Sequence, residues 1–111
     1  SGPLYASHRI DGSKIIVEFD YAAGGLRLGR KELLDPVKFE SGREVPNVEL
    51  AGEDGRWSPA KAVIEGPRLI VTNAKVPDPW HARYCYKNIP EPPFLYNAEG
   101  LPAATFTTSE K

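Results

Sequence analysis

Few side chains in this sequence could support nucleophilic or acid–base chemistry: it has two histidines, His8 and His81, and a single cysteine, Cys85. Nucleophilic catalysis needs a serine or cysteine next to a base, and usually an acid that orients that base. No spacing implies such a partner for either histidine, or a base beside Cys85. We therefore interpret all three as ordinary strand residues. They also lack the ligand spacing of a zinc site, so we expect no metal and no other cofactor.

Paired carboxylates are a second source of acid–base chemistry. Glu53 and Asp54 are adjacent, but Gly55 follows them directly in a turn signal, and nothing in the sequence places them across a cleft from another acid. We expect them to be solvated charges of a turn.

Aromatic side chains are the remaining candidates for a binding site. Trp57 and Trp80 stand beside turn signals, where an amphipathic ring could form a platform on which a sugar stacks. The alternative is that the aromatic residues pack inside the protein. On that interpretation Tyr84 and Tyr86 fill the core.

The elements that would position these residues are short strands. Residues 14–20 alternate, with Ile15, Val17 and Phe19 on one face, and residues 68–72 alternate with Leu69 and Val71 facing inward. Turn signals recur at the spacing of about 8–12 residues typical of an all-β sandwich, and no stretch sustains a helical apolar period. We predict an all-β, immunoglobulin-like antiparallel sandwich of about seven or eight strands. The expected strands cover residues 4–10, 14–20, 26–28, 37–39, 48–51, 57–65, 68–72 and 82–86, with one possible helical turn at 30–34.

The last third of the chain changes character after Tyr86. Pro90, Pro92 and Pro93 remove backbone donors and disfavour helix, which predicts an extended surface connection. Residues 95–103 mix apolar anchors with a glycine and a proline, and we expect a fixed loop there.

Size and charge exclude several classes of protein. A chain of 111 residues is the size of one sandwich domain and too small for a catalytic domain plus an accessory one. The net charge is −1 and no cluster of basic residues stands out, so nucleic acid and anionic membrane are poor candidates as partners. No run approaches the roughly 20 apolar residues of a membrane span, and Ser1-Gly2-Pro3 does not open a signal peptide.

Several motifs carry a resemblance to a known family. They are Ser1-Gly2-Pro3-Leu4-Tyr5, Ala51-Gly52-Glu53-Asp54-Gly55, Pro59-Ala60, Ile64-Glu65-Gly66, Arg83-Tyr84, Leu95-Tyr96-Asn97 and Glu99-Gly100-Leu101-Pro102-Ala103, followed by Phe106. With these motifs nearly the whole chain resembles the C-terminal end of bacterial sialate O-acetylesterases and related carbohydrate O-acetylesterases of the SGNH hydrolase type. Tyr86, where the family tends to have Trp, and Ala104-Thr105-Phe106, where it has Ser-Pro-Phe, depart from the family pattern.

The resemblance implies a serine esterase whose nucleophile lies in a Gly-Asp-Ser block and whose base lies in an Asp-x-x-His block. The second block is matched in this sequence by Asp78-Pro79-Trp80-His81. We reject it as catalytic, because no Gly-Asp-Ser occurs and Asp11-Gly12-Ser13 has the reverse order inside a turn. The resemblance also puts residues 78–81 in the sandwich domain. We therefore expect no catalytic residue in this chain, and no hydrolysis of acetyl esters by the chain alone.

Three functions remain open. The first is that residues 1–111 form a single C-terminal accessory domain, which packs on the upstream hydrolase domain of a sialate or xylan O-acetylesterase and stabilises it. The resemblance then implies an enzyme that is secreted or periplasmic, and interdomain contacts by Phe94, Tyr96 and Leu101. The second is a carbohydrate-binding module that uses Trp57 and Trp80 to hold an acetylated glycan. The third is a generic immunoglobulin-like interaction domain.

Overall fold

The computed structural model describes residues 1–42, 44–86 and 89–109. This part of the chain is all-β, with eleven strands in three antiparallel sheets and no helix. The prediction of an antiparallel β-sandwich is confirmed, although there are more strands than the seven or eight expected. Immunoglobulin-like connectivity stays a prediction. No helix in the described ranges could cross a bilayer.

The first sheet contains the strands whose alternation was clearest in the sequence. Its order is β1 (Leu4–Asp11), β2 (Lys14–Asp20), β8 (Arg68–Thr72) and β7 (Lys61–Glu65). Gly12 closes the β1–β2 hairpin with a φ of 62°, a conformation that glycine adopts without steric cost. Ile15 and Val17 of β2, like Leu69 and Val71 of β8, are completely buried, as expected.

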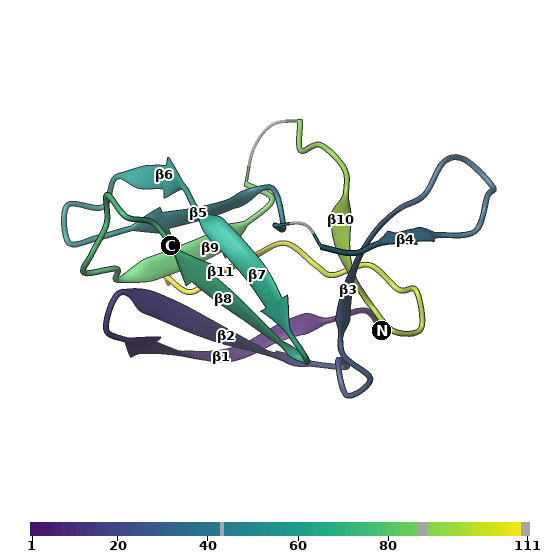
Figure 1. The fold of residues 1–111 in the computed structure, drawn as a ribbon, viewed down its shortest axis with the longest axis horizontal. Helices are drawn as coiled ribbons and strands as arrows, with labels where there is room; N and C mark the ends of the chain where they lie inside the picture. Colours follow the sequence, from purple (N-terminus) through teal and green to yellow (C-terminus); the bar gives the residue numbers. More distant parts are fainter. Residues whose placement is uncertain (43, 87–88, 110–111) are drawn as a thin grey trace.

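The second sheet packs its inner face against the first. Its order is β11 (Phe106–Thr107), β9 (His81–Tyr84), β5 (Val48–Ala51) and β6 (Trp57–Pro59). Residues of both sheets form one buried apolar cluster, in which Leu50, Ala82 and Tyr84 come from the second sheet. The single strand expected over 57–65 divides at Ala60, where the chain leaves the second sheet and enters the first (Figure 1). Pro59 is consistent with this division, because a proline within a strand pattern marks an edge or a bulge.

A smaller third sheet extends from one end of the sandwich, with the order β10 (Phe94–Asn97), β3 (Leu26–Arg30) and β4 (Lys38–Glu40) (Figure 1). The expectation of a loop over 95–103 is wrong in its first part, because Phe94–Asn97 pairs with β3 in a regular antiparallel register. Gly29 of β3 lies so close to Val37 that a Cβ atom there would be 2.8 Å from its Cγ1 atom. The close packing of β4 on β3 therefore depends on glycine at this position.

Two other local expectations are wrong. Residues 30–34 form no helical turn: Leu33 has a φ of 52°, and the tip of the β3–β4 hairpin closes with a hydrogen bond from the Asp35 amide to the Glu32 carbonyl. Strand β9 ends at Tyr84, because Cys85 has a φ of 61°. The alternation therefore stops before Tyr86, whose side chain is 46% exposed and not in the core.

Candidate functional site

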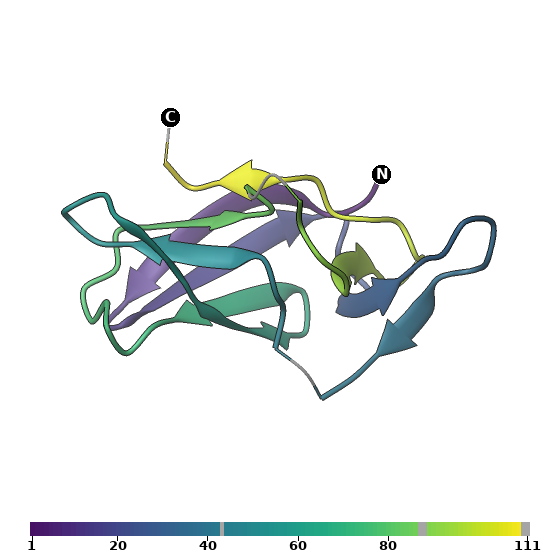
Figure 2. The same cartoon turned by 90° about the horizontal axis from the view of Figure 1, so that it is seen from above.

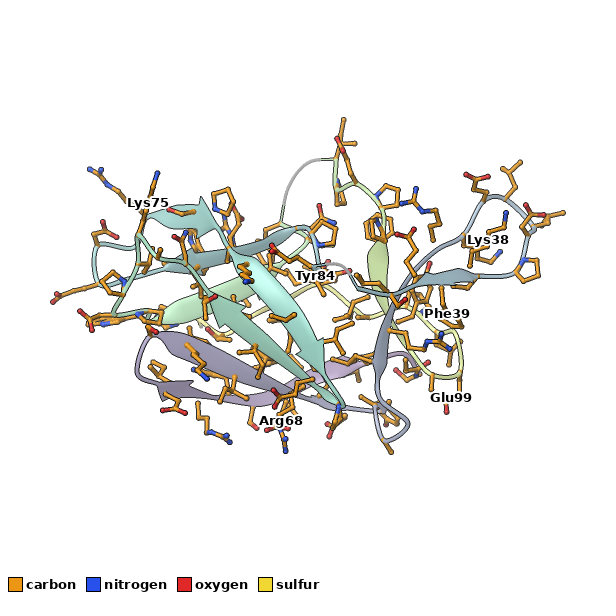
Figure 3. The ribbon with its side chains drawn as sticks, viewed as in Figure 1. Lys38, Phe39, Arg68, Lys75, Tyr84 and Glu99 are labelled. Carbon is orange, nitrogen blue, oxygen red and sulfur yellow. The ribbon has the colours of Figure 1, made fainter. Side chains whose placement is uncertain are left out.

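A cleft in the surface lies between the β5–β6 turn and the loop that joins β8 to β9. We call it the Trp80 cleft. It has a volume of about 690 Å³ and is lined by Gly52, Glu53, Asp54, Arg56, Ser58, Lys75, Val76, Pro77, Asp78 and Trp80. Figure 3 shows Lys75 at this end of the molecule, far from Lys38 and Phe39 on the third sheet.

Local hydrogen bonds fix both walls of the Trp80 cleft. In the β5–β6 turn, the Asp54 carboxylate accepts a hydrogen bond from the Arg56 amide at 2.9 Å, and Gly55 adopts a φ of 73°. In the opposite wall, the Asn73 side chain accepts a hydrogen bond from the Lys75 amide at 2.8 Å and donates one to the Pro59 carbonyl at 2.8 Å. The two walls are therefore held on the sandwich and do not depend on a ligand for their shape.

The backbone also fixes Trp80 itself. Its amide donates to the Ala51 carbonyl at 2.8 Å at the start of β9, while its side chain stays 48% exposed. A Cβ atom on Gly52 would come within 3.4 Å of the Asp78 carbonyl oxygen, so the two walls approach closely at that point.

Trp57 has a different environment from Trp80. The Arg83 guanidinium carbon lies 4.2 Å from the centre of the Trp57 ring and 5.2 Å from that of Tyr86, and Arg83 also pairs with Glu49 at 2.8 Å. One face of the Trp57 ring is thus covered by a paired cation. The structure does not join the two tryptophans into one lining, and a role for Trp57 in glycan binding stays a prediction.

The three residues predicted for an interdomain contact lie at the end of the molecule that carries the third sheet. Tyr96 is buried within this chain at 5% exposure, with its ring edge-on to Phe39, and Phe94 is half-buried. Leu101 is 43% exposed. Sequence reasoning missed Leu33 and Leu34 at the tip of the β3–β4 hairpin, which are 94% and 97% exposed. Two leucines directly before an Asp-Pro turn were the available signal.

The histidines lie in the sandwich, as strand residues. The Tyr5 hydroxyl and His8 Nδ1 are 2.6 Å apart, and His81 Nδ1 is 3.4 Å from the Thr108 hydroxyl. Burial, and then the neighbouring His81, lower the pKa of His8. Neither histidine hydrogen-bonds a serine in residues 1–42, 44–86 and 89–109.

Cys85 is half-buried, and burial raises the pKa of its thiol. The thiolate form that a nucleophile or a metal ligand requires is therefore disfavoured. Among the described residues no three histidine, cysteine, aspartate or glutamate side chains gather closely enough to hold a metal ion.

Comparison with solved structures finds a carbohydrate acetylesterase from Xanthomonas citri, with a TM-score of 0.81 and 30% sequence identity. The match covers 100% of this chain and 23% of the esterase chain, so the chain spans about a quarter of the length of that enzyme. No protein-family model matches the sequence. No curated protein matches it either. The chain is thus similar in fold to one domain-sized part of a carbohydrate acetylesterase.

Proposed function

We propose that this chain is a non-catalytic domain of a carbohydrate O-acetylesterase, which packs against the serine hydrolase domain of the same polypeptide and stabilises it. The observation that carries the proposal is the match of the whole chain to 23% of an acetylesterase, at 30% identity. The remaining part of such an enzyme would hold the nucleophile, the base and the oxyanion-binding groups. The motifs of the sequence point to sialate or xylan as the acetylated carbohydrate and to an exported enzyme.

The surroundings of the histidines support a non-catalytic role. An acyl-transfer site needs a serine or cysteine within hydrogen-bond reach of a histidine. His8 and His81 instead have Tyr5 and Thr108 as their hydrogen-bond partners in the described ranges, and burial keeps the Cys85 thiol protonated. The proposal therefore assigns all steps of ester hydrolysis to the other domain.

The tip of the β3–β4 hairpin supports contact with a second domain. Leu33 and Leu34 are almost completely exposed, and Leu33 also has the left-handed φ of 52°, which is unfavourable for a leucine. Fully exposed leucines in a strained turn do not stabilise the fold of this chain. An apolar groove on a neighbouring domain would compensate for both costs.

The N-terminus lies at the same end of the molecule as this hairpin in both views (Figures 1 and 2). The loop that carries Leu101 is also near, since a Cβ atom on Gly100 would lie 4.0 Å from both Val37 and Phe39. A hydrolase domain joined at Ser1 would therefore start at the end of the molecule that exposes Leu33, Leu34 and Leu101.

The first test concerns the coding sequence upstream of Ser1. We expect it to encode Gly-Asp-Ser and Asp-x-x-His blocks, and we expect the longer polypeptide to release acetate from acetylated xylan or O-acetylated sialic acid. The chain of 111 residues alone should release none. Acetate release by this chain, or an upstream sequence without those blocks, would contradict the proposal.

The second test concerns the contact. In the longer polypeptide, deletion of this domain should lower the melting temperature of the hydrolase domain, and the double variant Leu33→Asp/Leu34→Asp should reproduce part of that loss. Lys31→Asp, which adds a charge change on the same hairpin without removing apolar surface, is the control. If the deletion leaves the hydrolase domain equally stable, the stabilising role is wrong.

A further inference from the structure

We propose that the Trp80 cleft binds one ring of a neutral oligosaccharide, with the apolar face of the sugar on the indole of Trp80 and its hydroxyl groups hydrogen-bonded to Arg56, Lys75 and Asp78. This is a ligand site of the chain itself. The inference therefore goes beyond the proposed stabilising role and does not depend on a hydrolase partner.

The first step of the argument is the state of Trp80. The indole ring of a tryptophan has a large apolar surface, and burial of that surface normally stabilises a protein. Here the backbone of Trp80 is held to Ala51 at the start of β9, so the ring is presented on a rigid strand while half of it stays in contact with water. Its indole N–H has no hydrogen-bond partner among the described residues. A pre-positioned, half-exposed ring with an unused donor is suited to a ligand that is apolar on one face and polar at its edge.

The second step is the set of charged groups around the ring. Three carboxylates, those of Glu53, Asp54 and Asp78, and two cations, those of Arg56 and Lys75, line the Trp80 cleft. The side chains of Arg56, Lys75 and Asp78 form no ion pair within residues 1–42, 44–86 and 89–109. The cleft thus offers unpaired donors and unpaired acceptors side by side. Hydroxyl groups both donate and accept, so a polyhydroxylated ring can satisfy both kinds.

The charge balance decides between classes of ligand. Three acidic groups against two basic groups leave the cleft near neutrality, which gives no attraction for a polyanion such as nucleic acid or an acidic polysaccharide. An acidic or basic peptide would leave one sign of these charges unmatched. A neutral sugar has no charge, so neither the acidic nor the basic groups of the cleft repel it.

The third step is size and shape. A volume of about 690 Å³ lies inside the range of roughly 300–1,000 Å³ typical of small-molecule sites. The cleft is open to solvent, so the rest of a longer oligosaccharide can extend out of it. Both walls are fixed by Asn73 and by the Asp54–Gly55 turn, so little ordering is needed when a ligand binds.

Calorimetric titration of the 111-residue chain with xylohexaose, cellohexaose and mannohexaose tests the inference. We expect at least one of the three to bind, and Trp80→Ala to weaken that binding about tenfold or more, because removal of a central aromatic contact commonly has an effect of this size. Tyr86→Ala is the matched control, since Tyr86 is 46% exposed and does not line the cleft. The affinity of the Tyr86→Ala variant for the oligosaccharide should stay within about twofold of that of the unmodified chain.

A second measurement covers the case in which a variant does not fold. In the unmodified chain, addition of the bound hexasaccharide should shift the amide signals of Gly52, Arg56 and Lys75 and the indole N–H signal of Trp80 in a ¹⁵N correlation spectrum. No binding of any of the three hexasaccharides would overturn the inference. So would binding that shifts signals only elsewhere, or tighter binding of polygalacturonate than of the neutral sugars.

Discussion

The two ends of this chain's fold expose opposite kinds of side chain. At the end with the β5–β6 turn, Arg56, Lys75 and Asp78 surround the half-exposed ring of Trp80. At the end with the third sheet, the β3–β4 hairpin carries Leu33 and Leu34 into solvent. A mixture of unpaired charges and one aromatic ring suits a small polar solute, whereas adjacent leucines suit an apolar protein surface. This difference is the basis on which we propose ligand binding at one end and domain contact at the other.

The two ends also differ in how their polar groups are satisfied. Both contain an asparagine that donates to a backbone carbonyl and accepts from a backbone amide. Asn97 is buried at 2% exposure and hydrogen-bonds the Ser1 and Tyr21 carbonyls and the Leu101 amide, at 3.1, 3.1 and 3.0 Å. Asn73 makes its two hydrogen bonds in a part of the surface that water can reach. Asparagine should therefore contribute far more to the free energy of unfolding at the end with the third sheet.

The largest effect that we predict for a polar side chain comes from Asn97→Asp. The aspartate keeps the acceptor for the Leu101 amide but replaces the donors with an oxygen that faces the Ser1 and Tyr21 carbonyls. We expect the free energy of unfolding to fall by about 2–4 kcal/mol, because buried carbonyls lose their donors and a charge is buried without a partner. Urea denaturation of the isolated chain measures it. Asn73→Asp is the control and should cost less than about 1 kcal/mol; equal losses at both sites would remove the contrast between the ends.

Tyr84→Phe should have the next largest effect, because Tyr84 connects the sandwich to the third sheet. Its ring lies in the core on β9, stacked on Phe106, and its hydroxyl accepts a hydrogen bond from the buried Leu95 amide of β10 at 2.8 Å. Burial also raises the pKa of this hydroxyl well above its ordinary value, so it stays protonated. Phenylalanine leaves the amide unsatisfied at a cost of about 1–3 kcal/mol. Tyr86→Phe should be neutral in the same denaturation experiment, and a neutral Tyr84→Phe would refute the link.

The sequence predicted the strands whose signal is local. Alternation placed Ile15, Val17, Leu69 and Val71 in the core, and it would do so in any sandwich. It failed at Phe94–Asn97, because the prolines before this strand and Gly100 after it dominate the local pattern. The pairing of this strand with β3 is a long-range contact that no local pattern shows.

Only part of the candidate site could be predicted from the sequence. Trp80 could be selected as an aromatic residue beside a turn, but Arg56 and Lys75 could not, since they reach the same cleft from two separate connections. Trp57 has an equally suggestive position in the sequence, yet only the structure shows that Arg83, on β9 at the other side of β5, covers one face of its ring.

A smaller effect should follow from pH at His8. Burial and His81 lower the pKa of His8 below its ordinary value of 6.5, so the unfolded chain binds the proton more readily than the folded one. Stability should therefore be complete above pH 6.5 and decrease as the pH falls from 6.5 through the lower pKa of the folded state. Urea denaturation at pH 7.5 and 5.5 measures the difference, and His8→Gln should reduce it. A stability that rises on acidification over this interval would mean that His8 is stabilised in its charged form.

The smallest predicted effect on the isolated chain comes from the two exposed leucines at the tip of the β3–β4 hairpin. Leu33→Asn/Leu34→Ser should change the free energy of unfolding by less than about 0.5 kcal/mol, because both leucines are in water and asparagine adopts the left-handed conformation more readily. Leu95→Ala, which empties a completely buried site, should cost about 2–5 kcal/mol in the same assay. If the hairpin variant also cost several kcal/mol, the leucines would belong to the fold of this chain. They would then no longer support the proposed contact with another domain.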